Sequence, residues 1–320
     1  MTGYIVRRIL WIIPVLWAVV TITFFLMHAV PGGPFTQDQP LPEGVLDALN
    51  RRYNLDEPLW KQYLLYLWNI LHGDLGLSFR GDRDVSELIG QGFFVTAQLG
   101  LLAFFFAAIV GMALGVISAL NHNGPADYAG VFFATAGGSV PSFVLATFLI
   151  IIFAINLRWF DILGWGGPIE WGDTFKASAW DLNKMVLPVI SLGVLPAAYI
   201  ARVTRASMLE VLNQDYVRTA RAKGLRERMV VLRHAIKNAM IPVLTLMGPI
   251  FATLVTGSFI IENIFAIPGV GRAFVDAVLR RDYAMIMGST LFFAAVVAVA
   301  NLIVDLLYAV VDPRIRYGRS

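Results

Sequence analysis

Six apolar segments dominate this sequence of 320 residues. A helix that crosses a bilayer needs about 20 predominantly apolar residues, and each segment is close to that length. None of them alternates polar and apolar residues, as the short strands of a membrane β-barrel do. The sequence therefore predicts an all-α integral membrane protein with six transmembrane helices. The predicted spans are Ile9–Val30, Phe93–Leu120, Gly130–Asn156, Val186–Val203, Ala239–Ile261 and Tyr283–Val311.

Composition supports a membrane protein and excludes several kinds of site. Charged residues make up 15% of the chain, whereas a soluble domain has about 25%. The chain contains no cysteine, which excludes disulfide scaffolds, thiolate metal sites and cysteine nucleophiles. Its histidines form no HxxxH or HExxH pattern, which argues against a metal site built by the protein. Basic residues cluster beside apolar segments, so we expect membrane lipid, not nucleic acid, as their partner.

The distribution of basic residues predicts the orientation in the membrane. An even number of spans places both termini on one side, and both ends are basic. The segment from Ala201 to Pro242 carries nine basic and three acidic residues, a net charge of about +6. Under the positive-inside rule, this segment and both termini are cytoplasmic. The short Asn121–Asp127 loop has no Lys or Arg and leaves the assignment unchanged.

The segment from Gly32 to Gly92 is then extracytoplasmic. It holds five basic and nine acidic residues, a net charge of about −4. Pro58 before the apolar sequence LWKQYLLYLWNIL, and Gly73 after it, predict a helix with a proline start and a glycine end. Its aromatic side chains suit the membrane interface, and binding of a partner protein is the alternative role. We therefore divide the chain into a tail with the first span (1–31), an insertion (32–92), a five-helix core (93–311) and a cytoplasmic tail (312–320).

The most basic stretch, DYVRTARAKGLRERMVVLRHAIKNAMIP from Asp215 to Pro242, lies between two apolar spans. Its first part predicts a helix from Asp215 to Lys223 that ends at Gly224, because glycine readily adopts positive φ. A second helix should begin near Arg226 and continue into the fifth span. A short helix with Thr219 and Ala220 facing outward would suit docking into a groove of another protein. A positively charged anchor on anionic lipid fits the charge pattern equally well.

The same stretch resembles the cytoplasmic loop of permease subunits of bacterial ABC importers, whose pattern is Glu-Ala-Ala, three residues, then Gly. With Gly224 as the glycine, that triplet falls on Arg218, Thr219 and Ala220, and only the alanine is kept. Such departures are typical of the branch that moves dipeptides and oligopeptides. Further motifs resemble that branch's first permease subunit, namely YIVRRILWIIPVLW, FFLMHAVPGGP, YNLDEPLWKQYLLYLWNILHGDLGLSF, VPSF, ENIFAIPGVGRAFVDAVLRRDY and DPRIRYG.

The resemblance implies the type I ABC importer permease fold, in a bacterial or archaeal cytoplasmic membrane. It implies four kinds of interaction: with a second homologous permease subunit, with two cytoplasmic ATPase subunits, with an extracytoplasmic substrate-binding protein and with lipid. ATP and Mg would bind to the ATPases, and this chain would hold no cofactor and no catalytic site. A coupling loop (206–238) would contact an ATPase through Tyr216, Val217, Arg218, Thr219, Ala220, Arg221, Ala222, Lys223 and Gly224.

Three further positions are candidates for a gate or a pathway. Pro141, after the pair Gly137-Gly138, could kink the third span, whereas tight helix packing at small residues is the alternative. The PGVG sequence (Pro268, Gly269 and Gly271) could form a re-entrant gate or a plain turn. Asp305 stands four residues after Asn301 on the sixth span, hence on the same helix face. It could line a pathway or relay protons, or form an inter-helix hydrogen bond.

Other functions remain open on the sequence alone. An ion-gradient-driven secondary transporter would need ionisable residues near mid-membrane and commonly has an inverted repeat, and neither is clear. The chain has no GxxxxGK[ST] phosphate-binding loop, so an ATP-driven reading requires partner subunits. Within the resembled family, cargoes other than peptides include nickel chelates, glutathione and oligosaccharides.

Overall fold

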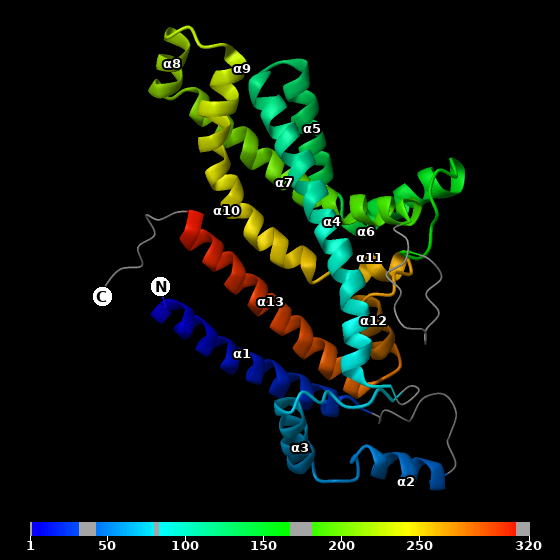
Figure 1. Cartoon of the computed structure of the whole chain (residues 1–320). Coiled ribbons are helices and arrows are strands. Elements are labelled where there is room, and N and C mark those ends of the chain that lie inside the picture. The colour runs from blue at the N-terminus through cyan, green and yellow to red at the C-terminus, as the bar shows by residue number, and fades with distance from the viewer. Residues whose placement is uncertain (1, 32–42, 80–82, 167–180, 312–320) are drawn as a thin grey trace. The chain divides into compact units, whose positions relative to one another are not determined.

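Helices account for all the long regular elements in the computed structural model (Figure 1). The structure describes residues 2–31, 43–79, 83–166 and 181–311. Across these residues the β-pairing is limited to an isolated antiparallel bridge between Leu77 and Asp84. The predicted all-α class is therefore confirmed.

Five helices are long and apolar enough to cross a membrane within the described chain. They are α1 (Thr2–Ala29), α4 (Val85–Leu120), α7 (Leu182–Leu212), α13 (Tyr283–Val311), and α10 (Ile236–Val255) together with the α9 (Glu227–Met229) and η2 (Val230–Ala235) turns that lead into it. A sixth candidate is a bent pair: α5 (Pro125–Ser139), followed by α6 (Ser142–Leu149) and the π-helix η1 (Ile150–Asn156). The shorter helices are α2 (Glu43–Arg52), α3 (Leu59–Leu71), α8 (Asp215–Ala222), α11 (Phe259–Ile264) and α12 (Val270–Leu279).

The third predicted span is a bent pair of helices and not one continuous helix. It bends by 107° between α5 and α6. Val140 has extended backbone (φ −88°, ψ 123°) and Pro141 follows with φ −57° and ψ 141°. Proline disfavours the helical conformation of the residue before it and has no N–H to continue the helix. Of the two alternatives left open by the sequence at Pro141, the structure has the kink, and it is sharp enough to divide the span in two.

The fifth span also differs from its prediction, because it ends at Val255 and not at Ile261. The chain turns at Gly257, whose φ is +79°. A new helix, α11, then begins after Ser258, whose side chain accepts a hydrogen bond from the backbone N–H of Ile261. The short polar sequence Thr256-Gly257-Ser258 interrupts the apolar run here, and the predicted span passed over it because the run resumes at Phe259.

Other prolines leave their helices continuous. Pro14 lies within α1, Pro188 and Pro196 lie within α7, and Pro242 lies within α10. Spanning helices tolerate proline where neighbouring groups satisfy the freed backbone atoms. These prolines therefore do not mark breaks, in contrast to Pro141.

Residue contacts divide the chain into two compact units. Unit 1 contains Met1–Val95 and Pro268–Leu302. Its core brings the start of α4 together with α12 and the start of α13, through Val85, Ile89, Val270, Ala277, Met285 and Ile286. The predicted helix after Pro58 is present as α3, and Gly73 follows it with φ +78°. An aromatic cluster around Phe24 and Tyr283 packs against Tyr63 and Tyr66 of α3.

Unit 2 contains Thr96–Ile267 and Ile303–Ser320. Here α4, α7 and α10 share a core that includes Ala107, Ala197, Ile200 and Val243. Small residues allow close approach: a Cβ at Gly111 of α4 would lie 2.6 Å from the carbonyl oxygen of Ala197 in α7. Close packing at small residues is typical of helices within membranes. The predicted division at residues 31, 92 and 311 stays a prediction, and parts of it lie outside the described residues.

Candidate functional site

The predicted helix in the basic stretch is present as α8, from Asp215 to Ala222. It is amphipathic. Val217 and Ala220 are buried, and they form a cluster with Val230 of η2. The opposite face is exposed and carries Tyr216, Arg218, Thr219, Arg221 and Ala222, with Lys223 just beyond the helix. A short apolar face thus packs the helix against the protein, and a mainly polar face is exposed.

One orientation in this helix was predicted wrongly. Thr219 faces outward as expected, but Ala220 is only 5% exposed and faces inward. Its spacing from Val217 explains the difference, because residues three apart lie on the same side of a helix. Ala220 therefore belongs to the buried face of α8 and not to its outer face.

Gly224 ends α8 with positive φ (+76°), as predicted. Its N–H donates to the carbonyl oxygen of Arg221 at 2.9 Å, and the N–H of Leu225 donates to that of Ala220 at 3.4 Å. This pair of bonds is the Schellman motif, which satisfies carbonyl groups at a helix end. The motif turns the chain sharply after α8, and Arg226 then precedes α9 as the sequence predicted for the second helix.

Two polar contacts tie α8 to the helix that follows it. The Arg221 guanidinium donates to both carboxylate oxygens of Glu227, at 2.7 and 3.1 Å. This contact raises the pKa of Arg221, chiefly through the hydrogen bond to Glu227. In α10, the Asn238 side-chain amide donates to the Tyr216 hydroxyl at 2.8 Å. The helix is therefore held near both of its ends as well as by its buried face.

The other candidate positions are not gathered at α8. Pro141 lies at the bend in unit 2, and Pro268, Gly269 and Gly271 belong to unit 1. Gly269 precedes α12, in which Val270 and Gly271 are buried. The PGVG sequence is thus the packed start of a helix. Asp305 lies in α13, but its side chain is outside the part of the chain that the structure describes.

Sequence reasoning missed a buried ion pair in unit 2. Asp127 in α5 has a side chain that is 3% exposed, and Arg205 in α7 donates to both of its oxygens at 2.6 and 2.7 Å. The Ser118 hydroxyl of α4 and the backbone N–H of Asn123 also donate to this carboxylate. His122 contacts it as well, through Nδ1 at 3.2 Å. The three helices α4, α5 and α7 are thus joined at one carboxylate.

A second buried acid was also missed. Glu262 of α11 is fully buried and accepts a hydrogen bond from the Thr96 hydroxyl of α4 at 3.1 Å. The same carboxylate oxygen would lie 2.5 Å from a Cβ at Gly257. The predicted fifth span ends one residue before Glu262, so the sequence prediction contains no intramembrane acid at this position. The structure makes it part of the packing between α4 and the Gly257 turn.

Within the described residues, no group of three or more His, Cys, Asp or Glu side chains could hold a metal ion. The features in this part of the chain that could have a function are helix α8, the buried carboxylates of Asp127 and Glu262, and a pocket in unit 1 that is described below.

Comparisons with known proteins agree with the motifs. Residues 111–317 match the family described as binding-protein-dependent transport system inner membrane component, and residues 1–100 match the N-terminal model of such components. The oligopeptide transport system permease protein OppB of Salmonella typhimurium is 44% identical over 318 residues, covering 99% of this chain and 100% of the relative. The dipeptide transport system permease protein DppB of Bacillus subtilis is 43% identical over 321 residues, covering 100% of both chains.

Solved structures show the same fold. An amino acid ABC transporter crystallised with histidines has a TM-score of 0.52 at 18% identity, covering 72% of this chain and 95% of that one. The MetNI methionine ABC transporter in an inward facing conformation has a TM-score of 0.55 at 17% identity, with coverage of 70% and 96%. The resemblance read from the motifs is thus confirmed, and the chain belongs to the family of binding-protein-dependent transport system inner membrane components, as a multi-pass ABC importer permease.

Proposed function

We propose that this chain forms half of the translocation pathway of an ATP-driven peptide importer, with both termini in the cytoplasm. The cargo follows from the relatives, which are named as oligopeptide and dipeptide permeases and match over essentially the whole chain. The orientation rests on the positive charge of the segment that contains α8. The chain itself catalyses nothing in this proposal, and ATP and Mg belong to partner subunits.

The complete importer contains four kinds of subunit in this proposal. A second homologous permease completes the pathway, two cytoplasmic ATPases supply energy, and an extracytoplasmic binding protein delivers the peptide. Family membership supports this assembly, because the family is defined by dependence on a binding protein.

The observation that carries the proposal is the anchored, amphipathic α8. Its apolar face is buried through Val217 and Ala220, while Tyr216, Arg218 and Thr219 remain exposed. A helix that only attached the chain to anionic lipid would direct apolar side chains toward the membrane. In α8 these side chains are used for packing within the protein. The exposed polar face is therefore available for a protein groove, which is how a coupling helix would contact an ATPase.

Force applied to α8 has a direct route into the membrane helices. Only Asn213 and Gln214 separate α8 from α7. Beside α8, Met208 of α7 packs in one cluster with Val231 and Ala235 of η2, which continues into α10. Closure of the ATPase dimer on ATP would move α8, and this packing would pass the movement to α7 and α10.

Crosslinking through a single engineered cysteine tests the coupling role. The chain has no native cysteine, and Ala222→Cys places a small thiol on the exposed face of α8 without disturbing the Arg221–Glu227 pair. Ala220→Cys is the matched control, because the same change on the same helix lies on the buried face. We expect Ala222→Cys to crosslink to co-expressed ATPase subunits with a yield that depends on ATP, and Ala220→Cys to remain unlinked. Labelling of Ala222→Cys by lipid-phase reagents without ATPase capture would contradict the coupling role.

Cargo is tested separately, in proteoliposomes that contain the complete importer. We expect uptake of a labelled tripeptide to require ATP and to be inhibited by unlabelled dipeptides or oligopeptides. Inhibition by nickel chelates, glutathione or oligosaccharides, but not by peptides, would reassign the cargo within the family. Uptake driven by an ion gradient without ATP would contradict the ATP-driven mechanism and favour a secondary transporter.

A further inference from the structure

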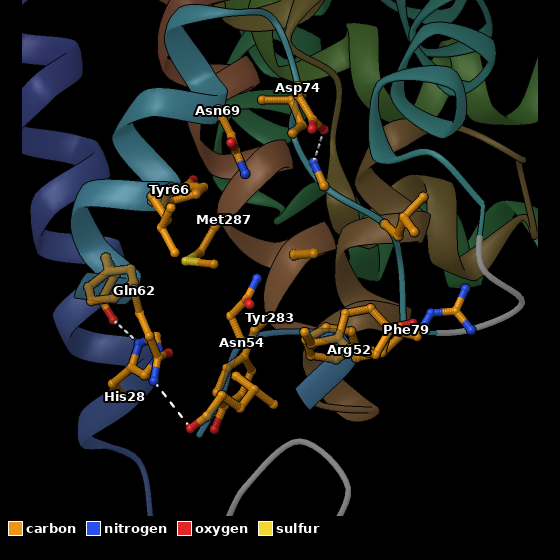
Figure 2. Close-up of a pocket in the computed structure, with 18 residues that line it drawn as sticks. His28, Arg52, Asn54, Gln62, Tyr66, Asn69, Asp74, Phe79, Tyr283 and Met287 are labelled. Carbon is orange, nitrogen blue, oxygen red and sulfur yellow. Dashed lines mark hydrogen bonds between the residues drawn. The ribbon is translucent and has the colours of Figure 1, made fainter. Parts of the chain in front are cut away.

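Unit 1 contains a pocket that the importer mechanism above does not use (Figure 2). Its volume is about 300 Å³, which is at the lower end of the range for ligand sites in proteins. The end of α1, helix α3 and the start of α13 contribute to its walls, together with the segments after α2 and α3. The lining residues that matter below are Phe24, Asn54, Tyr66, Asn69, Leu77 and Met287.

The pocket contains one buried polar atom, the Tyr66 hydroxyl, that has no partner among the described residues. Figure 2 shows the side chains of Asn69 and Asn54 pointing toward the cavity from opposite sides, and both residues are exposed, so their amides are accessible to a ligand. Buried hydroxyl groups usually have a hydrogen-bond partner, so the unpaired Tyr66 oxygen indicates that the pocket is built for something outside the chain.

The frame around these groups is already fixed. His28 of α1 bonds to the Phe24 carbonyl oxygen at 2.8 Å and to Gln62 of α3 at 3.1 Å. The Gln62 amide donates in turn to the carbonyl oxygens of Leu55 and Glu57, at 3.2 and 2.7 Å. The polar atoms of His28 and Gln62 are therefore already hydrogen-bonded within the protein and connect α1, α3 and the segment before α3. The pocket exists before any ligand arrives, which lowers the cost of binding.

We propose that this pocket binds a short extended segment of peptide, with an apolar side chain against Phe24 and Met287 and its backbone amides at Asn54, Asn69 and Tyr66. A side-chain amide both donates and accepts hydrogen bonds, and so does a peptide group. The Tyr66 O–H then donates to a backbone carbonyl oxygen. Burial raises the pKa of this phenol above its usual range, so the hydroxyl remains a donor throughout the physiological range.

The charges around the cavity favour a neutral segment. Arg52 and Asp74 both line it, so neither a free anion nor a free cation is selected. The lining residues of the pocket set the chemical class of the ligand. The peptide segment comes either from a free cargo peptide or from a loop of the external binding protein. Both sources, and entry from outside the cell, rest on the proposed function.

The test uses a reporter cysteine on the pocket wall of the otherwise cysteine-free chain, purified at full length in nanodiscs. Leu77→Cys is the reporter, because Leu77 lines the pocket and is exposed but supplies no proposed hydrogen bond. Asp56→Cys is the matched control, since Asp56 is exposed and does not line the cavity. The probe is the tripeptide Ala-Phe-Ala, and benzyl alcohol supplies the ring without peptide groups. We expect the tripeptide to slow maleimide labelling of Leu77→Cys at least fivefold, with no effect of benzyl alcohol and no change at Asp56→Cys.

A pair of tyrosine variants tests the hydrogen bond directly. Tyr66→Phe removes the unpaired hydroxyl and should raise the tripeptide concentration needed for half-maximal protection about tenfold while the protein folds normally. Tyr63→Phe is the control on the same helix, because its hydroxyl already bonds to Thr21 at 2.7 Å and does not line the pocket. Equal protection in wild type and Tyr66→Phe would overturn the assignment of the hydroxyl.

The source of the segment is resolved in a second arm. Protection by the tripeptide alone identifies a free peptide as the occupant. Protection only when the external binding protein is added, in the absence of free peptide, identifies a loop of that protein. Labelling that neither reagent slows would overturn the proposal. None of these measurements needs an ATPase, so they remain informative if the crosslink at Ala222→Cys fails. Conversely, that crosslink does not depend on the pocket.

Discussion

Arg205 of α7 holds Asp127 of α5 through two parallel hydrogen bonds, at a carboxylate that Ser118 of α4 also contacts. Bidentate pairing is the strongest geometry for an arginine and a carboxylate. Because Asp127 is almost fully buried, its charge depends on these donors. One carboxylate thus links three membrane helices at the point where α7 approaches α8.

Removing one member of this pair should destabilise the protein strongly. We expect Arg205→Met to lower the free energy of unfolding by about 3–5 kcal/mol, because it leaves a buried carboxylate without its counter-charge. Unfolding of the purified protein in SDS measures the change. Asp215→Asn is the control, since Asp215 is exposed and lies 3.9 Å from Arg218, and it should have no measurable effect. If Arg205→Met and Asp215→Asn lower the free energy of unfolding by similar amounts, burial does not determine how much the Arg205–Asp127 pair contributes.

Two glycines with nearly the same positive φ should respond differently to alanine. Gly224→Ala meets open space, so we expect only the backbone cost of about 1–2 kcal/mol. Gly257→Ala brings the same cost and also places its Cβ against Thr96 and Glu262, and overpacking adds about 1–3 kcal/mol. SDS unfolding of both variants gives the comparison. A Gly257→Ala loss no larger than that of Gly224→Ala would show that the α4–α11 contact adjusts freely.

The bend at Pro141 should relax when the proline is removed. Spin labels at Tyr128→Cys in α5 and Ile155→Cys in η1 both occupy exposed positions. With Pro141→Ala we expect the distance between them to increase toward the ~40 Å of a straight helix of this length. Pro196→Ala, inside the continuous α7, should leave the distance unchanged. If Pro141→Ala also leaves it unchanged, packing of α6 against α7 holds the bend.

Tyr66 should make the protein sensitive to alkaline pH. Burial raises its pKa in the folded state, while an unfolded tyrosine ionises near pH 10. Above about pH 10 the unfolded state therefore loses its phenolic proton before the folded state does, and stability falls as pH rises. Tyr66→Phe should flatten this decline, which unfolding measured between pH 8 and 11 can detect. An unchanged decline in Tyr66→Phe would assign it to other groups.

Local signals in the sequence predicted some of these features well. Gly224 and the amphipathic run before it define α8 within ten residues of chain, and the resemblance to a permease adds its candidate role. The inward position of Ala220 was available from its spacing to Val217. The small side chain of Ala220 suits an outward docking face as well as close packing, and only the spacing to Val217 separates the two.

Other features depend on contacts that sequence reasoning cannot see. Asp127 and Arg205 are 78 residues apart, and Arg205 had been counted as one of the positive charges that orient the chain. A kink at Pro141 was one of two alternatives, and a proline alone does not decide between them, since Pro188 and Pro196 lie within the continuous α7. Glu262 was not predicted as a buried acid because the expected fifth span ended at Ile261, and its burial depends on the contact with Thr96 of α4.

The brevity of the connection between α7 and α8 has a mechanical consequence. Two residues, even fully extended, span at most about 7 Å, so the Asn213–Gln214 link contains almost no slack. A displacement of α8 is then not absorbed by loop flexibility but appears at the end of α7 nearly undiminished. The stiffness of this joint is set by the length of the link more than by which residues form it.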